Sequence, residues 1–298
     1  MAYLALSFEL RGLDPQRAES ACQELGALAI TFSDSRDDAV LEPAPGEVRL
    51  WPATRVQALY AGDADGAALS VALAQALCFD GDRIASEQLA DRAWEREWLK
   101  DFHALRFGRR LWICPHHERV DAADAVVVKL DPGLAFGTGT HPSTALCLQW
   151  LDAQLPRGAR VIDYGSGSGV LGIAAGLLGA ARVDAFDIDP QALLATAENA
   201  AANGLATRLI VHHDAAALPP RADILLANIL AGTLCALAAD FASRLEPGGR
   251  ILLAGILAGQ ADAVTAVYAP WFDISPGGER EGWVALAGTR NQHVHSLS

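Results

Sequence analysis

The fold is decided by two stretches, Val161-Ile162-Asp163-Tyr164-Gly165-Ser166-Gly167-Ser168-Gly169 and Val183-Asp184-Ala185-Phe186-Asp187. In the first, an apolar run enters three glycines at alternate positions, and a segment of small residues typical of a helix follows. The second is another apolar run, which ends in a carboxylate about twenty residues after the first glycine. A strand, tight turn, helix and strand in this order place a nucleoside at the carboxyl edge of a parallel sheet. The sequence therefore predicts a cofactor-binding α/β enzyme.

The spacing of the glycines bears on the kind of cofactor. A dinucleotide fingerprint has its third glycine further along, so that the pyrophosphate meets the next helix's N-terminus. Here Gly165, Gly167 and Gly169 alternate, and Asp163 precedes them, which suits a cationic amino group rather than a phosphate. We expect S-adenosylmethionine, with Asp163 at its amino acid end, Gly165 and Gly167 giving it close approach, and Asp187 accepting from the ribose hydroxyls. Nicotinamide or flavin nucleotides, or a purely structural glycine turn, stay open as alternatives.

The length and charge of the chain set further bounds. A single hydrophobic core stops growing near ~250 residues, so a chain of 298 residues predicts two domains. The net charge of −13 argues against direct nucleic-acid binding, which needs a basic face, and favours a basic protein substrate. The alternative that acidity only keeps the chain soluble stays open. No apolar run approaches the ~20 residues of a membrane helix, and no leader is evident, which favours a cytoplasmic protein.

The five cysteines, at positions 22, 78, 114, 147 and 235, form no closely spaced pair. Such spacing indicates reduced thiols in a reducing compartment rather than a disulfide framework or a zinc site. We therefore expect no metal site, and each cysteine is most simply a small buried side chain.

Residues 1–88 are predicted to form a small separate α+β domain. Tyr3–Glu9 has the pattern of a strand, Asp14-Pro15 begin a helix, and two strands, a helix and a short strand follow. The order β-α-β-β-α-β is the ferredoxin-like pattern. Residues 89–103 are predicted to form a connecting helix, on which Trp94 and Trp98 share one face. These tryptophans either dock on a domain or contact the substrate.

Residues 104–298 are predicted to form the second domain, in which strands and helices alternate. Asp189-Pro190 start a helix that Asn203-Gly204 end, and Pro247-Gly248-Gly249 are predicted to turn the chain into a strand at 250–254. Two final strands, at 272–274 and 283–287, follow the last helix directly. They predict an antiparallel last strand, which distinguishes a class I methyltransferase Rossmann-like sheet from dinucleotide-binding sheets.

Asn228 is the candidate catalytic residue. It follows a predicted strand at 222–227, and sheets of this type bind ligands at the carboxyl ends of their strands. Its amide oxygen can accept a hydrogen bond from an attacking amine and aim the nitrogen lone pair at a methyl group. Methyl transfer from a sulfonium has a neutral leaving group, so positioning can supply much of the acceleration without an acid. The alternative is that Asn228 is only a turn residue.

The segment Asp131–Thr144 is too rich in glycine for a helix or a strand, and its last two residues begin a helix. A helix N-terminus with free N–H groups and hydroxyls suits a carboxylate, so we expect Thr144 to bind that end of the cofactor. His141 is a candidate proton acceptor or, alternatively, a residue that orders the loop. Asp214 is a candidate for binding the adenine amino group or, equally, part of a surface turn.

Together these residues resemble the PrmA-type protein methyltransferases, which act on the large-subunit ribosomal protein eleven. The resemblance is strong over residues 90–290 and weaker before them. Ser166 stands where the family usually has cysteine and Ser143 where it often has threonine, and both keep size and polarity. The shared motifs are Trp94–Trp98, Phe107–Pro115, Asp131–Thr144, Asp163–Gly169, Asp187–Pro190, Glu198-Asn199, Asn203-Gly204 and Asn228–Gly232.

The resemblance implies trimethylation of lysine ε-amines and of the N-terminal α-amine of that ribosomal protein. It also implies an N-terminal domain that recognises the substrate, a flexible linker, and cofactor contacts at Thr144, Gly165, Asp187 and Asn228. Two other functions stay open. One is a methyltransferase that acts on RNA or on another amine, and the other is a noncatalytic module that binds the cofactor or the ribosomal protein.

Overall fold

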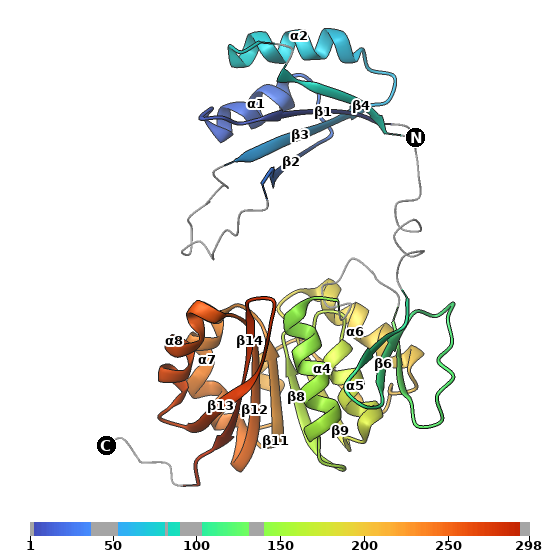
Figure 1. The fold of residues 1–298 in the computed structure, drawn as a ribbon, viewed down its shortest axis with the longest axis vertical. Coiled ribbons are helices and arrows are strands. Elements are labelled where there is room, and N and C mark those ends of the chain that lie inside the picture. Colours follow the sequence, from blue (N-terminus) through green and yellow to red (C-terminus); the bar gives the residue numbers. More distant parts are fainter. Residues whose placement is uncertain (1–2, 37–52, 81–82, 90–102, 131–139, 293–298) are drawn as a thin grey trace. The chain divides into compact units, whose positions relative to one another are not determined.

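The computed structural model describes residues 3–36, 53–80, 83–89, 103–130 and 140–292. The chain divides into two compact units, Met1–Glu97 and Trp98–Ser298 (Figure 1). Nearly all of the predicted connecting helix at 89–103, with Trp94 and Trp98, lies outside the described residues, as does most of the predicted loop at 131–144. The predicted domain limits, 1–88 and 104–298, stay predictions.

The first unit has the predicted β-α-β-β-α-β order (Figure 1). Its antiparallel sheet has the strand order β2-β3-β1-β4. Leu4, Leu6 and Phe8 alternate along β1 and are buried against the helices, which gives this unit its own apolar core. The elements are β1 (Tyr3–Glu9), α1 (Pro15–Glu24), β2 (Ala29–Asp34), β3 (Thr54–Ala61), α2 (Gly66–Leu77) and β4 (Ala85–Leu89).

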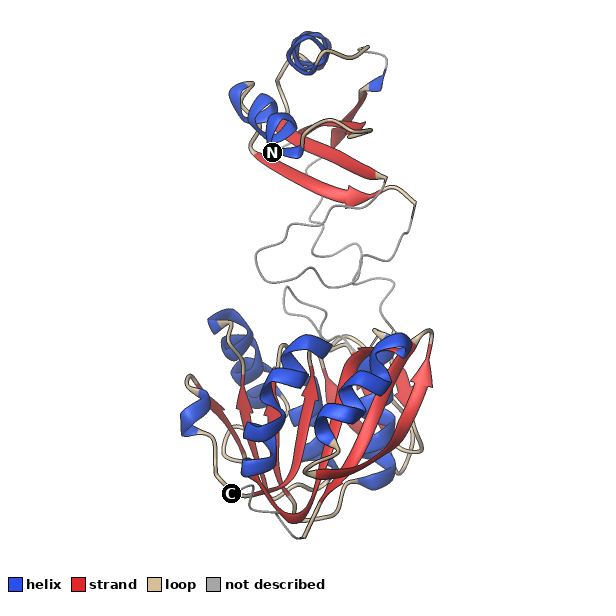
Figure 2. Cartoon of the chain, turned by 90° about the vertical axis from the view of Figure 1, so that its left-hand side faces the viewer, coloured by secondary structure: helices blue, strands red, loops and turns tan. Residues whose placement is uncertain are grey.

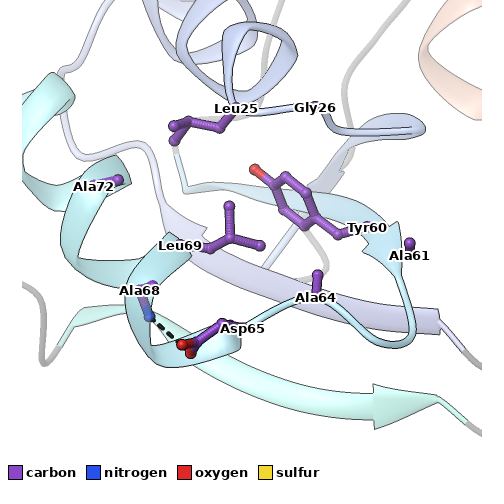
Figure 3. Close-up of a pocket in the computed structure, with 9 residues that line it drawn as sticks. All are labelled: Leu25, Gly26, Tyr60, Ala61, Ala64, Asp65, Ala68, Leu69 and Ala72. Carbon is purple, nitrogen blue, oxygen red and sulfur yellow. Dashed lines mark hydrogen bonds between the residues drawn. The ribbon is translucent and has the colours of Figure 1, made fainter.

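A hollow of about 430 Å³ lies between the end of α1 and the start of α2 (Figure 3). Asp65 caps α2, since its Oδ1 accepts from the backbone N–H of Ala67 at 3.0 Å and of Ala68 at 3.1 Å. The ring of Tyr60 points from β3 into the space between Leu25 and Leu69 (Figure 3). Its hydroxyl is buried and makes no hydrogen bond of standard geometry among the described residues, and burial together with the neighbouring Cys22 thiol raises its pKa.

The second unit is built on a seven-stranded sheet of order β10-β9-β8-β11-β12-β14-β13. Strand β14 runs antiparallel to both of its neighbours, while β10, β9, β8, β11 and β12 pair in parallel, which confirms the predicted antiparallel last strand. The strands are β8 (Arg160–Tyr164), β9 (Arg182–Phe186), β10 (Leu209–His212), β11 (Ala222–Asn228), β12 (Leu245–Leu257), β13 (Phe272–Arg280) and β14 (Trp283–Arg290).

Helices cover both faces of this sheet (Figure 2). Successive side chains of a strand point to opposite faces, so Val161 joins the core beneath α4 and α5 whereas Ile162 joins the core beneath α7 and α8. Ile224 and Leu225 divide in the same way. The helices are α4 (Pro142–Gln154), α5 (Val170–Leu178), α6 (Pro190–Ala202), α7 (Ala231–Arg244) and α8 (Ala261–Tyr268), with short 3-10 turns η3 (Ala215–Ala217) and η4 (Ala258–Gln260).

A separate three-stranded sheet, of order β5-β6-β7, precedes α4. Its strands are β5 (Leu105–Phe107), β6 (Leu111–Cys114) and β7 (Val126–Lys129), and their buried side chains join the core beneath α4 and α5. The five cysteines, all within described residues, form no disulfide there. In the part of the chain that the structure describes, no helix is both long and apolar enough to cross a membrane.

Strand β12 differs from the sequence prediction. The residues Pro247-Gly248-Gly249, expected as a turn before a strand at 250–254, lie inside a strand that already begins at Leu245. Leu245 faces Ala222 of β11, and Arg250 faces Ile224, so residues 246–249 bulge out opposite a single position. Proline and glycine favour a turn locally, but pairing with β11 on both sides keeps the chain in the sheet.

Candidate functional site

A cavity of about 470 Å³ opens at the carboxyl edge of the large sheet, a size usual for small-molecule sites. Its lining comes from the ends of β9, β8, β11 and β12, from the start of β14, and from the first turn of α4. The lining residues are His141, Ser143, Thr144, Tyr164, Gly165, Ser166, Gly167, Val170, Leu171, Phe186, Asp187, Ile188, Asn228, Ile229, Leu230, Thr233, Gly255 and Trp283.

Asp187 is joined to the glycine loop that follows β8. Its Oδ2 accepts from the backbone N–H of Gly167 at 2.9 Å, and its Oδ1 accepts from the N–H of Asp189 at 3.0 Å. The N–H groups of Gly165 and Ser166 both donate to the carbonyl of Phe186, at 2.8 and 3.0 Å. These bonds hold the loop and the carboxylate as one rigid wall, while the remaining lone pairs of Asp187 can still accept from a ligand.

The packing of the structure requires glycine at position 165, which the sequence alone does not reveal. Its φ is +79°, and a Cβ built there would lie 2.3 Å from Cγ2 of Ile229. Gly255, on the other side of β11, has the same φ, and its Cβ would lie 2.4 Å from the carbonyl oxygen of Ile229. Ile229, which follows β11, therefore packs between Gly165, which follows β8, and Gly255 of β12. The packing of Ile229 is thus one reason for glycine at position 165. Close approach of a ligand to Gly165 stays a prediction.

Asp163 lies beneath the loop rather than in the cavity. It is 1% exposed and is absent from the lining, and its Oδ2 accepts from the backbone N–H of Gly172 at 2.8 Å. Burial, with a smaller contribution from the charge of Asp187, raises the pKa of Asp163 to about 7 despite the lowering effect of that hydrogen bond. The structure thus brings Gly165, Gly167, Asp187, Thr144 and Asn228 together and leaves Asp163 behind the wall.

Thr144 and Asn228 meet across the cavity floor. Asn228 ends β11, and its Nδ2 donates to Oγ1 of Thr144 at 3.2 Å. Thr144 lies in the first turn of α4 and is 1% exposed, so its hydroxyl is fixed by the helix and by the surrounding core. The amide oxygen of Asn228 consequently points away from Thr144.

His141 is the N-cap of α4. Its Nδ1 accepts from the backbone N–H of Ser143 at 3.3 Å and lies 2.8 Å from the Ser143 hydroxyl. Its ring packs edge-on against Trp283, with centroids 4.6 Å apart. Burial lowers the pKa of His141, and the charge of Glu281 opposes that shift. His141 thus caps the helix that carries Thr144, as its loop-ordering alternative required, and it also lines the cavity.

The remaining sequence candidate, Asp214, does not reach the cavity. Its carboxylate caps the 3-10 turn η3, accepting from the N–H of Ala216 at 2.9 Å. Asp214 is therefore part of a surface turn, which was the alternative to binding the adenine amino group. Across the residues that the structure describes, no group of three or more His, Cys, Asp and Glu side chains is placed to hold a metal ion.

Helix α6 braces the site in a way that sequence reasoning missed. Nδ2 of Asn199 donates to the carbonyl of Ser168 in the glycine loop, at 2.9 Å. Asn203 accepts from the N–H of Lys129 at 2.7 Å and donates to its carbonyl at 2.8 Å, which ties down the end of β7. Both asparagines belong to the shared motifs, so the family pattern was the available signal.

Three further lining residues were also missed. Ile188 is 89% exposed and Leu230 is 60% exposed, both at the lip of the cavity. Trp283 opens β14 and reaches the cavity because it pairs with Leu257 at the end of β12. No local motif marks Trp283, since its place depends on the antiparallel insertion of β14 into the sheet.

Comparison with known proteins identifies the family. The model of the family described as "Ribosomal protein L11 methyltransferase (PrmA)" matches residues 2–291. A ribosomal protein L11 methyltransferase from Methylococcus capsulatus is 53% identical over 274 residues, covering 91% of this chain and 93% of that protein. One from Pseudomonas aeruginosa is 48% identical over 282 residues, covering 93% of this chain and 96% of the relative.

A solved structure supports the same assignment. The crystal structure of a ribosomal protein L11 methylase from Lactobacillus delbrueckii subsp. bulgaricus superimposes with a TM-score of 0.59. It is 32% identical and covers 64% of this chain and all of that chain. The match of sequence and fold confirms the class I methyltransferase architecture. The chain belongs to the ribosomal protein L11 methyltransferase family.

Proposed function

We propose that this chain transfers methyl groups from S-adenosylmethionine to ribosomal protein L11, trimethylating lysine ε-amines and the N-terminal α-amine. Family membership supports the transfer and the substrate, because the relatives carry that substrate in their names. One observation carries the proposal: Asp187, the glycine loop, Thr144 and Asn228 line a single cavity at the carboxyl edge of the sheet. In the proposal, the unit Met1–Glu97 recognises the substrate.

The lining of the cavity fits S-adenosylmethionine. Asp187 can accept from the ribose hydroxyls at one end, and the apolar side chain of Ile188, 89% exposed beside it, can cover the adenine ring. The first turn of α4 presents Thr144, whose hydroxyl accepts from Asn228 and can still donate to a carboxylate, while both polar groups of Ser143 contact His141. The backbone of Gly165 and Gly167 lines the cavity between these ends, with the side chain of Ile229 packed against Gly165.

In the proposal, Asp163 supports the cofactor site without touching the cofactor. It holds the N–H of Gly172 in the first turn of α5 and so fixes the floor on which the glycine loop rests. With a pKa raised to about 7, it is partly neutral at physiological pH. We assign Asp163 to the cofactor site as a support of the loop.

Asn228 orients the accepting nitrogen. When bound, S-adenosylmethionine supplies an electrophilic methyl group on a positively charged sulfur. The amide oxygen of Asn228 accepts a hydrogen bond from the amine and aims the nitrogen lone pair along the line of attack. As the new N–C bond forms, the C–S bond breaks and its electron pair stays on sulfur, so the leaving group departs neutral. The nitrogen gains the positive charge, and loss of a proton restores a lone pair before the next methylation.

The amine must reach the site without its proton. A lysine has an ordinary pKa of about 10.4 and is mostly charged at neutral pH. Removing it from water lowers that pKa, because burial penalises the charged form. Among the described residues that line the cavity, Asp187 is the single carboxylate, and it stands two strands away from Asn228. The described part of the accepting end therefore offers no carboxylate in the lining that would keep the lysine protonated.

The proposal includes a cytoplasmic location, where ribosomal proteins are made, and neither a membrane nor a direct nucleic-acid partner. The net charge of −13 supports a basic protein as substrate. A methyltransferase acting on RNA is the rival.

The test incubates the chain with radiolabelled cofactor, ribosomal protein L11 and ribosomal RNA together. We expect label in the protein alone, and we expect Asn228→Ala to lower the transfer rate by about a hundredfold or more with unchanged thermal unfolding. Asn291→Ala, outside the cavity lining, is the matched control and should keep full activity. Label in RNA, or an active Asn228→Ala enzyme, would refute the proposal.

A further inference from the structure

The order of the strands arranges the cavity lining along a line. From one side to the other, the rim carries Asp187 after β9, Gly165 after β8, Asn228 on β11, Gly255 on β12 and Trp283 on β14. Neighbouring strands lie about 4.8 Å apart, so Asn228 stands about 10 Å from each end of this row. If the nucleoside occupies the end at Asp187, as in the proposed function, the amine must occupy the side toward Trp283.

Among the described lining residues, that side of the cavity is aromatic and holds no carboxylate. Trp283 is half-buried, and the ring of His141 packs against it with a centroid distance of 4.6 Å. Burial lowers the pKa of His141, which leaves its ring neutral at physiological pH. Glu281, whose charge acts on the His141 ring, lies two residues before Trp283 and outside the cavity lining, and its Oε1 accepts from Nε of Arg280 at 3.1 Å.

We propose that Trp283, braced by His141, forms the subsite for the accepting amine and holds it through its mono-, di- and trimethylated cationic forms. This inference rests on the proposed amine methylation. Trp283 is the specificity-determining residue of the subsite. Tyr164 and Phe186 also line the cavity, but they end β8 and β9 on the Asp187 side, whereas Trp283 offers its π-face to a cation on the other side of Asn228. His141 is a positioning residue, because it acts through the tryptophan ring and through the start of α4.

The chemistry of repeated methylation explains why an aromatic ring suits this place. Each transfer puts a positive charge on the nitrogen, and two of the three steps need that nitrogen to lose a proton before it reacts again. A carboxylate here would raise the pKa of the amine and keep the proton on it. A π-face attracts the developing cation while adding no full negative charge. The attraction also keeps a methylated side chain bound between transfers.

The test follows the degree of methylation rather than the rate alone. Ribosomal protein L11 is incubated with cofactor and either the unaltered chain, Trp283→Leu or Trp283→Phe, and the products are resolved by mass spectrometry. We expect Trp283→Leu to shift the products from trimethyl toward monomethyl lysine at equal total turnover, and Trp283→Phe to keep most trimethylation. Trp112→Leu, which removes a tryptophan of β6 outside the cavity lining, is the matched control and should leave the distribution unchanged.

A binding measurement gives a second readout, independent of turnover. Calorimetry measures how a peptide with a trimethylated target lysine binds the chain in the presence of S-adenosylhomocysteine. We expect Trp283→Leu to weaken this binding by about fivefold to thirtyfold and to weaken the unmethylated peptide less, as a cation–π contact of about 1 to 2 kcal/mol predicts. An unchanged product distribution with active Trp283→Leu would overturn the inference. Absence of methyl transfer by the unaltered chain would instead overturn the proposed function.

Discussion

The side-chain nitrogen of Asn228 donates a hydrogen bond of 3.2 Å to the hydroxyl oxygen of Thr144, 84 positions earlier in the chain. This bond joins the end of β11 to the first turn of α4 and determines which way the amide oxygen faces. We expect Thr144→Val to slow methyl transfer by about tenfold, the cost of one lost positioning hydrogen bond, whereas Thr144→Ser should stay close to the unaltered chain. Single-turnover rates at saturating cofactor measure this. Equal rates for the valine and serine variants would contradict the role of the hydroxyl.

Asp163 makes stability depend on pH in a defined direction. Its pKa is about 7 in the folded chain against an ordinary value of 3.8. Between these pH values the carboxyl is protonated in the folded state and ionised in the unfolded state. The free energy of unfolding therefore falls as the pH rises from about 4 to about 7, and Asp163 causes no further change above that range. Asp163→Asn cannot ionise and keeps an acceptor for Gly172.

Urea unfolding of both chains across this range tests that relation. We expect similar free energies of unfolding at about pH 4, a growing advantage of Asp163→Asn up to about pH 7, and a constant difference beyond. Parallel curves over the whole range would show that the buried carboxyl does not titrate as inferred.

Gly165 is coupled to Ile229. Gly165→Ala places a Cβ 2.3 Å from Cγ2 of Ile229 in a backbone with φ of +79°. We expect it to lower the free energy of unfolding by about 1 to 3 kcal/mol, through backbone strain and overpacking. In Gly165→Ala/Ile229→Ala the clash is gone, so the double variant should lose less than the sum of the two single losses. Strict additivity of the two changes would argue that the residues do not press on each other.

Tyr60 offers a stabilising change in the first unit. Its buried hydroxyl, which faces the space between Leu25 and Leu69, makes no hydrogen bond of standard geometry among the described residues, and its neighbour Cys22 offers only a weakly bonding thiol. Tyr60→Phe removes that desolvated group and keeps the ring, so we expect the free energy of unfolding to rise by about 1 kcal/mol. Tyr60→Ala is the control and should lose about 3 to 5 kcal/mol. A clear loss of stability in Tyr60→Phe would reveal a hydrogen bond made by the hydroxyl.

Local signals in the sequence predicted the elements that carry the cofactor loop. The apolar run at 161–164, the alternating glycines and the cap at Asp189-Pro190 are each a short local pattern, and they appear in the structure as β8, the loop and the start of α6. The order of elements likewise predicted the antiparallel place of β14. The strand ends were less predictable, because β13 and β14 extend beyond the apolar residues through pairing with each other.

Contacts between distant segments could not be predicted in this way. Trp283 meets His141 because β14 pairs with β12, and Asn203 meets Lys129, 74 positions away, because α6 packs beside β7. For Asp163, the local sequence pattern suggests a contact that the structure does not contain. Its position before the glycines suggests contact with a ligand, but alternation along β8 turns its side chain toward Gly172 and away from the cavity.

Calorimetric titration of the whole chain with S-adenosylmethionine measures directly whether the cavity holds the cofactor. We expect saturable binding to one site, weakened by about tenfold or more in Asp187→Asn, which removes the charge that accepts from the ribose. Asp273→Asn, on the exposed side of β13, should bind like the unaltered chain. No heat of binding, or equal affinity in the Asp187 variant, would contradict the claim that this cavity holds the cofactor.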